Sequence, residues 1–325
     1  MAAHKLGRLW LSESADEVKH LHTGSARSAG AVKAPFGYFG AKQRLAAQLL
    51  AMLPPHNAWV EAFCGSAALT LAKPPAPLEV INDRDGEIVN LFVQLRENAK
   101  ALCRAIALTP YARAEYEEAR SAASSSDPLE RARRFLVLAM MSVNGTVGDA
   151  GTGFSYSSSY SRGNREARVN RWYHLPERLE QVVERLRSVR IENIDARELL
   201  VKFSKRPATL VYLDPPYYVK RSYGYTFDEN NPEFHQALLK ICQASSCMIM
   251  ISGYENDLYN DLLRPECGWV CSRIDTSTRS HTGKDFARTE VTWCNAALVE
   301  ARATGRLPVE LSATERKQKK VNPER

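Results

Sequence analysis

The residues best suited to chemistry follow one short apolar segment. Asp214, Pro215, Pro216 and Tyr217 come directly after the run 210–213. That run is apolar without alternation and stops at a breaker, which predicts a buried parallel strand. Each proline fixes its own φ and keeps the residue before it out of the helical region. Asp214 and Pro215 are therefore expected to be extended at the carboxyl end of a strand, where open α/β sheets bind ligands.

This arrangement suits recognition of a planar exocyclic amine. The Asp214 carboxylate and the Pro215 carbonyl are acceptors, and the prolines offer no N–H. Two accepted hydrogen bonds would localise the lone pair of the amine and stabilise positive charge that develops on it during methyl transfer. Tyr217 could stack on the attached ring. The alternative interpretation is a structural turn after a strand.

A second carboxylate, Asp83, ends the predicted strand 78–83. It follows the turn at Gly65 by about 20 residues, the spacing at which dinucleotide sites place an acid against ribose hydroxyls. The stretch 58–69 reads as strand, tight turn and helix, and Gly65 permits close backbone approach to a ligand. Alternatively, Asp83 only caps the next helix, which we expect over 87–107.

A lysine and a third acid are further candidates. Lys42 follows a turn rich in Pro and Gly and begins a helix predicted over 45–53, where a cation and backbone N–H groups attract a carboxylate. The alternative is an ordinary loop with a solvated lysine. Asp195 ends the predicted strand 189–195, although it could equally be the N-cap of a helix over 196–203.

The alternation of strands and helices stops between residues 99 and 171. Helices are expected over 111–123 and 129–141, and a loop rich in Gly, Ser and Tyr follows. Its continuation is rich in arginine, and flexible polar loops of this kind suit phosphate and base contacts. A solvated loop with incidental arginines is the alternative. The arginines are Arg162, Arg165, Arg168 and Arg171.

The remaining elements complete an α/β pattern. Helices are expected over 175–188 and 232–245, and a buried strand over 248–253. Segments 270–276 and 290–298 read as a closing antiparallel pair, with a polar, basic loop between them. That loop carries Arg279, His281, Lys284 and Arg288, and we assign His281 no catalytic role.

Composition narrows the class only mildly. The chain has 325 residues, 44% of them hydrophobic, enough for one α/β domain with an insertion. A net charge of +7 favours a polyanionic partner. The seven cysteines lack zinc spacing, so we expect reduced thiols and no metal site. No run is long enough for a transmembrane helix and no signal-peptide core is present, which favours a cytoplasmic protein.

These motifs, in this order, resemble the Dam-like (D12 class) DNA adenine N6-methyltransferases from about residue 33 to about residue 298. Asp214–Tyr217 matches the catalytic motif. The chain departs from the family pattern where Ala41 and Ala67 replace glycines, Ala62 replaces a proline and Gly253 replaces an asparagine.

The resemblance implies a Rossmann-like sheet that binds S-adenosyl-L-methionine, with a mainly helical target-recognition insertion. It implies catalytic roles for Asp214, Pro215, Pro216 and Tyr217. It implies cofactor contacts for Tyr38, Lys42, Glu61, Phe63, Gly65, Asp83, Asp195 and Asp214, and DNA contacts for Arg162, Arg165, Arg168, Arg171, Arg279, Lys284 and Arg288.

The expected organisation has five parts: a disordered segment 1–32, catalytic segments 33–98 and 172–300, the insertion 99–171, and a disordered basic tail 301–325. The predicted function is methylation of adenine N6 in double-stranded DNA after base flipping, in a bacterial or phage-infected cell, by a restriction-modification or orphan enzyme. N4-cytosine methylation, RNA amino-methylation and an inactive DNA-binding relative are the alternatives. A monomer and a weak dimer both fit the sequence.

Overall fold

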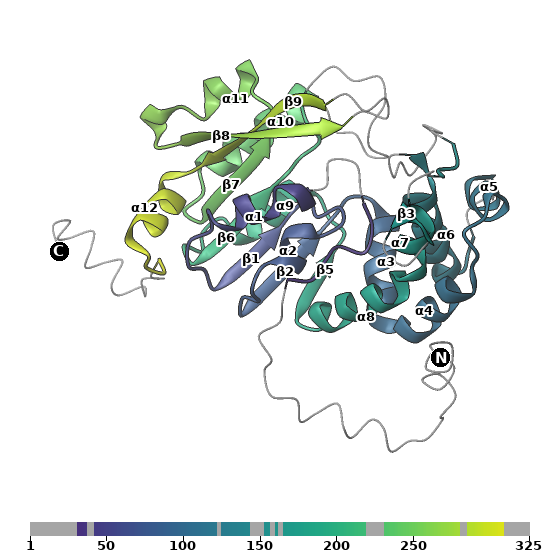
Figure 1. The fold of residues 1–325 in the computed structure, drawn as a ribbon. Helices are drawn as coiled ribbons and strands as arrows, with labels where there is room; N and C mark the ends of the chain where they lie inside the picture. The colour runs from purple at the N-terminus through teal and green to yellow at the C-terminus, as the bar shows by residue number, and fades with distance from the viewer. Residues whose placement is uncertain are drawn as a thin grey trace. The chain divides into compact units, whose positions relative to one another are not determined.

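The computed structural model describes residues 31–37, 42–121, 125–143, 153–156, 160–161, 165–218, 231–279 and 285–308. Its centre is a seven-stranded sheet in the order β5-β2-β1-β6-β7-β9-β8 (Figure 1). The first five strands of that order are mutually parallel, and β9 is antiparallel to both β7 and β8. The strands of this sheet are β1 (Ala58–Glu61), β2 (Leu78–Asn82), β5 (Val189–Glu192), β6 (Thr209–Leu213), β7 (Met248–Gly253), β8 (Val270–Arg279) and β9 (Asp285–Cys294).

Helices surround the sheet, and a two-stranded ribbon of β3 (Tyr160–Ser161) and β4 (Arg165–Glu166) lies apart from it. The helices up to the insertion are α1 (Ala46–Leu50), preceded by the 3₁₀ turn η2 (Lys42–Arg44), α2 (Ala68–Ala72) and α3 (Gly86–Glu97). Next come α4 (Ala99–Leu108), α5 (Arg113–Ser121), α6 (Pro128–Met141), α7 (Ala167–Tyr173) and α8 (Leu175–Leu186). The rest are α9 (Ala196–Phe203), α10 (Pro232–Gln243), α11 (Asp257–Leu262), the 3₁₀ turn η4 (Pro265–Cys267) and α12 (Ala296–Thr304).

Alternating side chains of the central strands feed two separate cores. On one face, Val211 and Ile249 pack with residues of α9, α10 and α11. On the other, Leu210 and Met250 pack with residues of α1, α2 and α12. A doubly covered sheet explains why these strands are apolar without alternation.

The fold predicted from sequence is confirmed. All five predicted parallel strands are present, and the strand order reverses between β1 and β6, the point at which doubly wound sheets bind ligands. The helices predicted near 129–141, 175–188, 196–203 and 232–245 are present as α6, α8, α9 and α10.

Two predicted helices were too long. The helix expected over 87–107 is interrupted at Asn98, whose side chain donates to Gln94 Oε1 at 2.8 Å and whose φ of −129° is not helical. Asparagine competes for local hydrogen bonds in this way and so favours helix ends. The helix expected over 45–53 ends at Leu50, since Pro54 disfavours a helical conformation at the residue before it.

The end of the chain also differs from the prediction. Strands β8 and β9 extend to the pair Arg279↔Asp285, so much of the expected basic loop is paired hairpin. Its polar sequence carries no alternation that would have revealed strands. Segment 296–304, read partly as strand and partly as tail, is helix α12, capped by Asn295, which accepts from Leu298 N at 3.1 Å.

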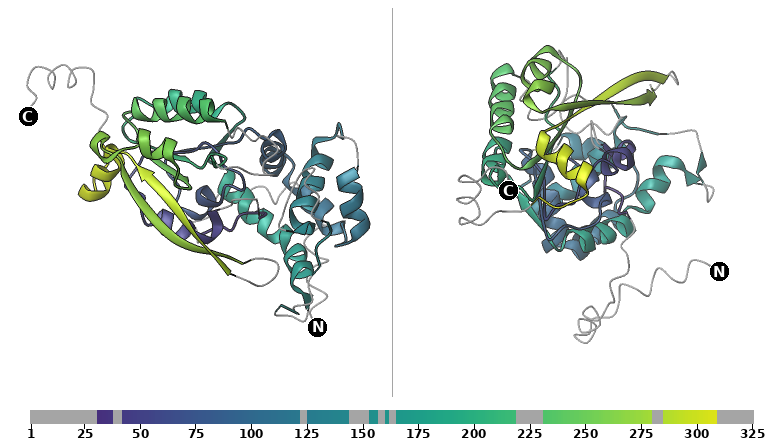
Figure 2. Two further views of the ribbon diagram at one scale, coloured as in Figure 1. Left: turned by 90° about the horizontal axis from the view of Figure 1, so that it is seen from above. Right: turned by 90° about the vertical axis from the view of Figure 1, so that its left-hand side faces the viewer.

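Helices α3–α8 gather beyond the β5 edge of the sheet, and β8 forms the opposite edge (Figures 1 and 2). They share one core with Ile81 of β2 and Val189 of β5. The arginine-rich segment, expected as a flexible loop, forms β4 and α7 from residue 165 onward. The proposed boundaries at 99 and 171 stay predictions, because this core spans both.

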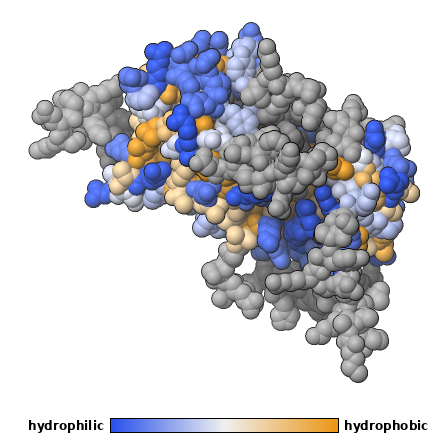
Figure 3. Space-filling model, turned by 45° about the horizontal axis from the view of Figure 1, so that its top comes forward, coloured by the Kyte–Doolittle hydropathy of each residue, from blue (hydrophilic) through white to orange (hydrophobic). Residues whose placement is uncertain are grey.

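The surface is mixed in character. On the face drawn in Figure 3, hydrophilic and hydrophobic residues are interspersed. All seven cysteines lie in the described residues and are free. Among the described helices, none has the length and apolar character needed to cross a membrane.

Candidate active site

Four acidic residues lie at the same edge of the sheet. Glu61 ends β1, and Asp83, Asp195 and Asp214 follow the ends of β2, β5 and β6. Because these strands are parallel and adjacent in the sheet, their carboxyl ends share one edge. The sequence prediction that Asp83, Asp195 and Asp214 follow strands at one edge is thus confirmed, while the roles of all four acids are treated below as proposals.

Asp214 contacts Lys42, which lies 172 residues earlier in the sequence. Lys42 Nζ lies 2.7 Å from both carboxylate oxygens of Asp214. The lysine side chain is 6% exposed and the aspartate side chain 16% exposed, so the lysine is buried and the aspartate keeps some contact with solvent. Lys42 was predicted as a cofactor residue, and the structure adds a direct contact with the catalytic motif.

Tyr217 is held by its hydroxyl. It accepts from Lys42 Nζ at 2.5 Å and donates to Glu290 Oε1 at 2.5 Å. Its ring meets Tyr254 edge-on, with centroids 4.5 Å apart. Burial, together with Asp214 and Glu290, raises the pKa of Tyr217 well above its usual value, so the phenol stays protonated and remains a donor.

Glu290 is a site residue that the sequence reasoning missed. It lies on β9, is 5% exposed, and has Oε1 3.4 Å from Lys42 Nζ. Burial raises its pKa, with Lys42 acting in the opposite direction. Because β9 runs antiparallel to β7, its early residues reach the edge where the parallel strands end. The signal available in the sequence was that this acid begins the predicted strand 290–298.

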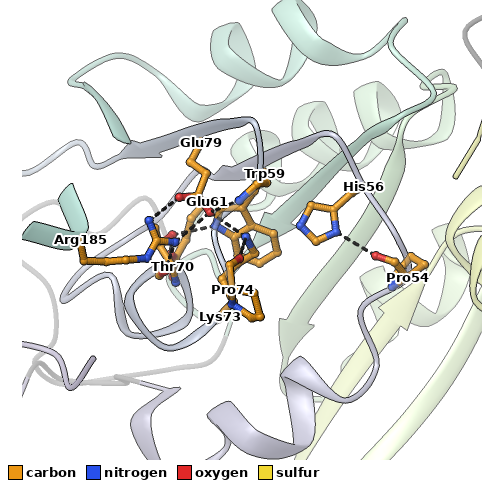
Figure 4. Close-up of polar contacts among 10 residues, drawn as sticks. Pro54, His56, Trp59, Glu61, Thr70, Lys73, Pro74, Glu79 and Arg185 are labelled. Carbon is orange, nitrogen blue, oxygen red and sulfur yellow. Dashed lines mark hydrogen bonds and ion pairs between the residues drawn. The ribbon is translucent and has the colours of Figure 1, made fainter. Parts of the chain in front are cut away.

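The Glu61 side chain is held by hydrogen bonds from Thr70 (Figure 4). Its Oε2 accepts from Thr70 N at 3.1 Å and from the Thr70 hydroxyl, which in turn accepts from Trp59 Nε1 at 2.7 Å. Burial raises the pKa of Glu61 to about 7. The carboxyl group therefore changes charge near neutral pH.

The turn after β1 has a left-handed backbone at two positions. Gly65 has a φ of 48° and Ala67 a φ of 53°, and Ala67 is the one non-glycine residue with positive φ in the described part of the chain. The family pattern has glycine at both positions, and the structure gives the physical reason. Phe63, just before the turn, is half-buried with its ring edge-on to Phe234.

Asp83 holds this turn rather than the next helix. Its Oδ2 accepts from Gly65 N at 2.8 Å and its Oδ1 from Asp85 N at 3.0 Å. The N-cap of α3 is Asp85, which accepts from Glu87 N at 2.8 Å, so the interpretation of Asp83 as the cap is wrong. Burial raises the pKa of Asp83 to about 6.

Asp195 caps its helix, as one of the two interpretations stated. It accepts from Arg197 N at 2.7 Å and pairs with the Arg197 guanidinium at 2.5 Å. The Arg197 side chain lowers the pKa of Asp195, which stays ionised. Contact with a cofactor remains a prediction for this residue.

The arginines predicted to bind DNA lie on different elements and have different surroundings. Arg165, on β4, lies over the Tyr173 ring at 4.1 Å, and Arg168 and Arg171 are on α7. Burial lowers the pKa of Arg171, and Arg168 adds to that effect. Arg279 and Arg288 belong to paired hairpin strands, while Tyr38, Arg162 and Lys284 lie outside the described residues.

The donors and acceptors at this edge fit S-adenosyl-L-methionine. Carboxylates at Asp83 and Glu61 match hydroxyl donors and a positively charged sulfonium, and the left-handed turn at Gly65 lets a ligand approach the backbone. In the described residues, no group of three or more His, Cys, Asp or Glu could hold a metal ion.

The parallel sheet, with acids at its carboxyl-end edge, is a Rossmann-like α/β fold with the features of a ligand-binding site at that edge. The family model described as D12 class N6 adenine-specific DNA methyltransferase matches residues 38–272, more than half of the chain, and the protein belongs to this family. It therefore transfers a methyl group from S-adenosyl-L-methionine to adenine N6 of DNA.

Solved structures show only distant likeness. A precorrin 8w decarboxylase from Methanobacterium thermoautotrophicum is 10% identical, with a TM-score of 0.33 and coverage of 83% of this chain and 98% of that chain. A SAM-dependent methyltransferase from Agrobacterium tumefaciens is 8% identical, with a TM-score of 0.36 and coverage of 80% and 63%. A search of curated protein sequences found no match.

Proposed function

We propose that the enzyme acts on double-stranded DNA in the cytoplasm and flips the target adenine out of the helix. The exocyclic amine cannot be reached within the base stack, so extrusion precedes chemistry. The target-recognition insertion at 99–171 and the β8–β9 hairpin would hold the DNA. Arg165 and Arg168 of the insertion, with the hairpin arginines, suit phosphate contacts.

Asp214 and the Pro215 carbonyl would accept the two N–H groups of adenine N6. A carboxylate accepts up to about four hydrogen bonds, so Asp214 can take the amine while Lys42 is still bound. Both acceptors stabilise positive charge as it develops on nitrogen. Tyr217 would contact the base, with its hydroxyl anchored by Lys42 and Glu290.

When bound, S-adenosyl-L-methionine supplies the methyl group. Asp83, Glu61 and Asp195 would hold it along the strand ends, with Phe63 and the Gly65 turn beside it. No covalent bond to the enzyme is required, because Asp214 and Pro215 align the nitrogen directly. The methylated nitrogen is acidic, so water can take its proton and no strong base is needed.

The observation that carries this proposal is the position of Asp214: it lies at the strand edge that also holds Glu61 and Asp83 and is 16% exposed. We expect Asp214→Ala to abolish methylation. The assay uses tritiated S-adenosyl-L-methionine and unmethylated bacterial genomic DNA, and mass spectrometry of the nucleosides identifies the product. Asp261→Ala, which removes an exposed aspartate that pairs only loosely with Arg264 at 3.8 Å, is the control.

The nucleoside analysis also decides between alternatives. N6-methyladenine is the expected product. Detection of N4-methylcytosine would instead show that cytosine is the substrate base. Faster methylation of RNA than of duplex DNA would contradict the proposed partner. Full activity of Asp214→Ala would remove Asp214 from the chemistry.

A further inference from the structure

Lys42 lies between two carboxylates that come from different strands. Its ammonium is 2.7 Å from Asp214 and 3.4 Å from Glu290, and Tyr217 links it to Glu290 through two hydrogen bonds of 2.5 Å. Lys42 and Glu290 side chains are each 6% exposed. One buried cation thus faces two carboxylates at the catalytic motif.

A lysine at this position poses an electrostatic problem for the reaction. The amine gains positive charge during methyl transfer, and Asp214 is the group proposed to stabilise that charge. An ammonium in direct contact with both oxygens of Asp214 cancels most of its field. With Lys42 and Asp214 alone, the site would be neutral where negative potential is required.

We propose that Glu290 is a positioning residue that serves as the second counter-ion of Lys42, so that the charge of Asp214 remains available to the adenine amine. This inference rests on the proposed role of Asp214. With Glu290 ionised, the cluster carries one net negative charge. Glu290 also accepts from the Tyr217 hydroxyl and so orients the phenol toward Lys42 as an additional acceptor.

The pairing of β9 with β7 determines where Glu290 lies. Val291 of β9 is paired with Gly253 at the end of β7, which places the preceding residue, Glu290, at the carboxyl-end edge of the sheet. A Cβ on Gly253 would lie 3.3 Å from the Trp293 ring of β9, so the two strands are closely packed at this point. The position of Glu290 is therefore held by strand pairing.

The first experiment measures single-turnover methylation at saturating S-adenosyl-L-methionine and saturating unmethylated genomic DNA. Glu290→Gln keeps the shape of the side chain and its acceptor oxygen but removes the charge. We expect the rate constant to fall about tenfold or more, with little change in cofactor affinity by calorimetry. Glu255→Gln removes an exposed carboxylate paired with Arg273 and should leave the rate unchanged.

The decisive test is a double-mutant cycle with Lys42→Met. If Glu290 acts through Lys42, then Glu290→Gln should cost less than about threefold once the lysine is absent. An equal cost in both backgrounds would overturn the proposal, as would a Glu290→Gln rate within twofold of wild type. Glu290→Asp keeps the charge and should be several-fold faster than Glu290→Gln, and the reverse order would also refute the idea.

The outcomes separate this inference from the proposed function. An inactive Asp214→Ala enzyme combined with a fully active Glu290→Gln enzyme would contradict only the role of Glu290. An active Asp214→Ala enzyme would contradict the proposed chemistry itself. Thermal unfolding of each variant shows whether a lost rate reflects a lost fold.

Discussion

Two buried ionic clusters lie at opposite ends of the parallel strands and have opposite stoichiometry. At the active-site edge, Lys42 faces Asp214 and Glu290. Near the start of β2, Glu79 faces Lys73 at 2.7 Å and Arg185 at 2.5 Å (Figure 4). The first cluster has two carboxyl groups for one cation, and the second has two cations for one carboxylate.

The charged groups of the cluster around Glu79 are paired with groups of the protein itself. Arg185 also donates to Thr70 O at 2.7 Å, and Lys73 to Pro74 O at 2.7 Å, so both cations have further partners. Glu79 is fully buried, and this end of the strands is where an open sheet does not bind ligands. In the active-site cluster, by contrast, the Asp214 side chain is 16% exposed, as its proposed contact with a substrate amine requires. The comparison separates charges that are paired wholly within the fold from a charge that we propose to bind the substrate.

The largest expected effect follows from removing Glu79. Glu79→Ala leaves two buried cations without their shared carboxylate and should lower the free energy of unfolding by about 3–5 kcal/mol. Urea denaturation measures this loss. Glu184→Ala, in an exposed pair with Arg187 at 3.2 Å, should cost less than about 0.5 kcal/mol. Equal losses for the two variants would remove the distinction between the clusters.

A smaller effect concerns pH. The pKa of Glu61 is raised to about 7, so the folded protein binds a proton that the unfolded chain has already released. Stability should therefore fall by about 1–3 kcal/mol as pH rises from about 4.5 through 7. Denaturation between pH 5 and 8 tests this, and Glu61→Gln should flatten the profile. If the slope of stability against pH is unchanged in that variant, then another group is responsible for the titration.

The stability contributed by Glu79 depends on pH in the opposite direction. Burial raises the pKa of Glu79, but the hydrogen bonds from Arg185 and Lys73 outweigh it, and the net pKa is lowered. Its contribution to stability is present above the unfolded pKa and is lost as pH falls through the folded value. The pKa shifts of Glu61 and Glu79 thus change stability with pH in opposite directions.

The smallest predicted effect is at Ala67. A left-handed alanine costs about 1–2 kcal/mol, which glycine avoids at some expense in chain entropy. Ala67→Gly should therefore stabilise the protein by about 0.5–1 kcal/mol, measured by urea denaturation. A destabilised variant would mean that the buried methyl group contributes more by packing than the φ of 53° costs.

The parallel sheet could be predicted because its strands are apolar on both faces and end at breakers or acids. Asp214 and Asp83 were found for the same reason, since each acid follows a strand directly. The closing antiparallel pair was also predicted, but its extension to the pair Arg279↔Asp285 and helix α12 were not, because the polar residues carry no alternation and Asn295 follows an apolar strand without a break. The role of Asp83 on the Gly65 turn required coordinates, because an acid before a helix looks like a cap in sequence.

The sequence by itself determined the class of fold, the motif Asp214–Tyr217 and the family to which they belong, because these depend on local patterns along the chain. The tertiary structure decided which charges meet. Lys42, Asp214 and Glu290 come from segments far apart in sequence and approach one another only when η2, β6 and β9 are assembled. No local pattern encodes that meeting, since it depends on the order and direction of strands within the sheet.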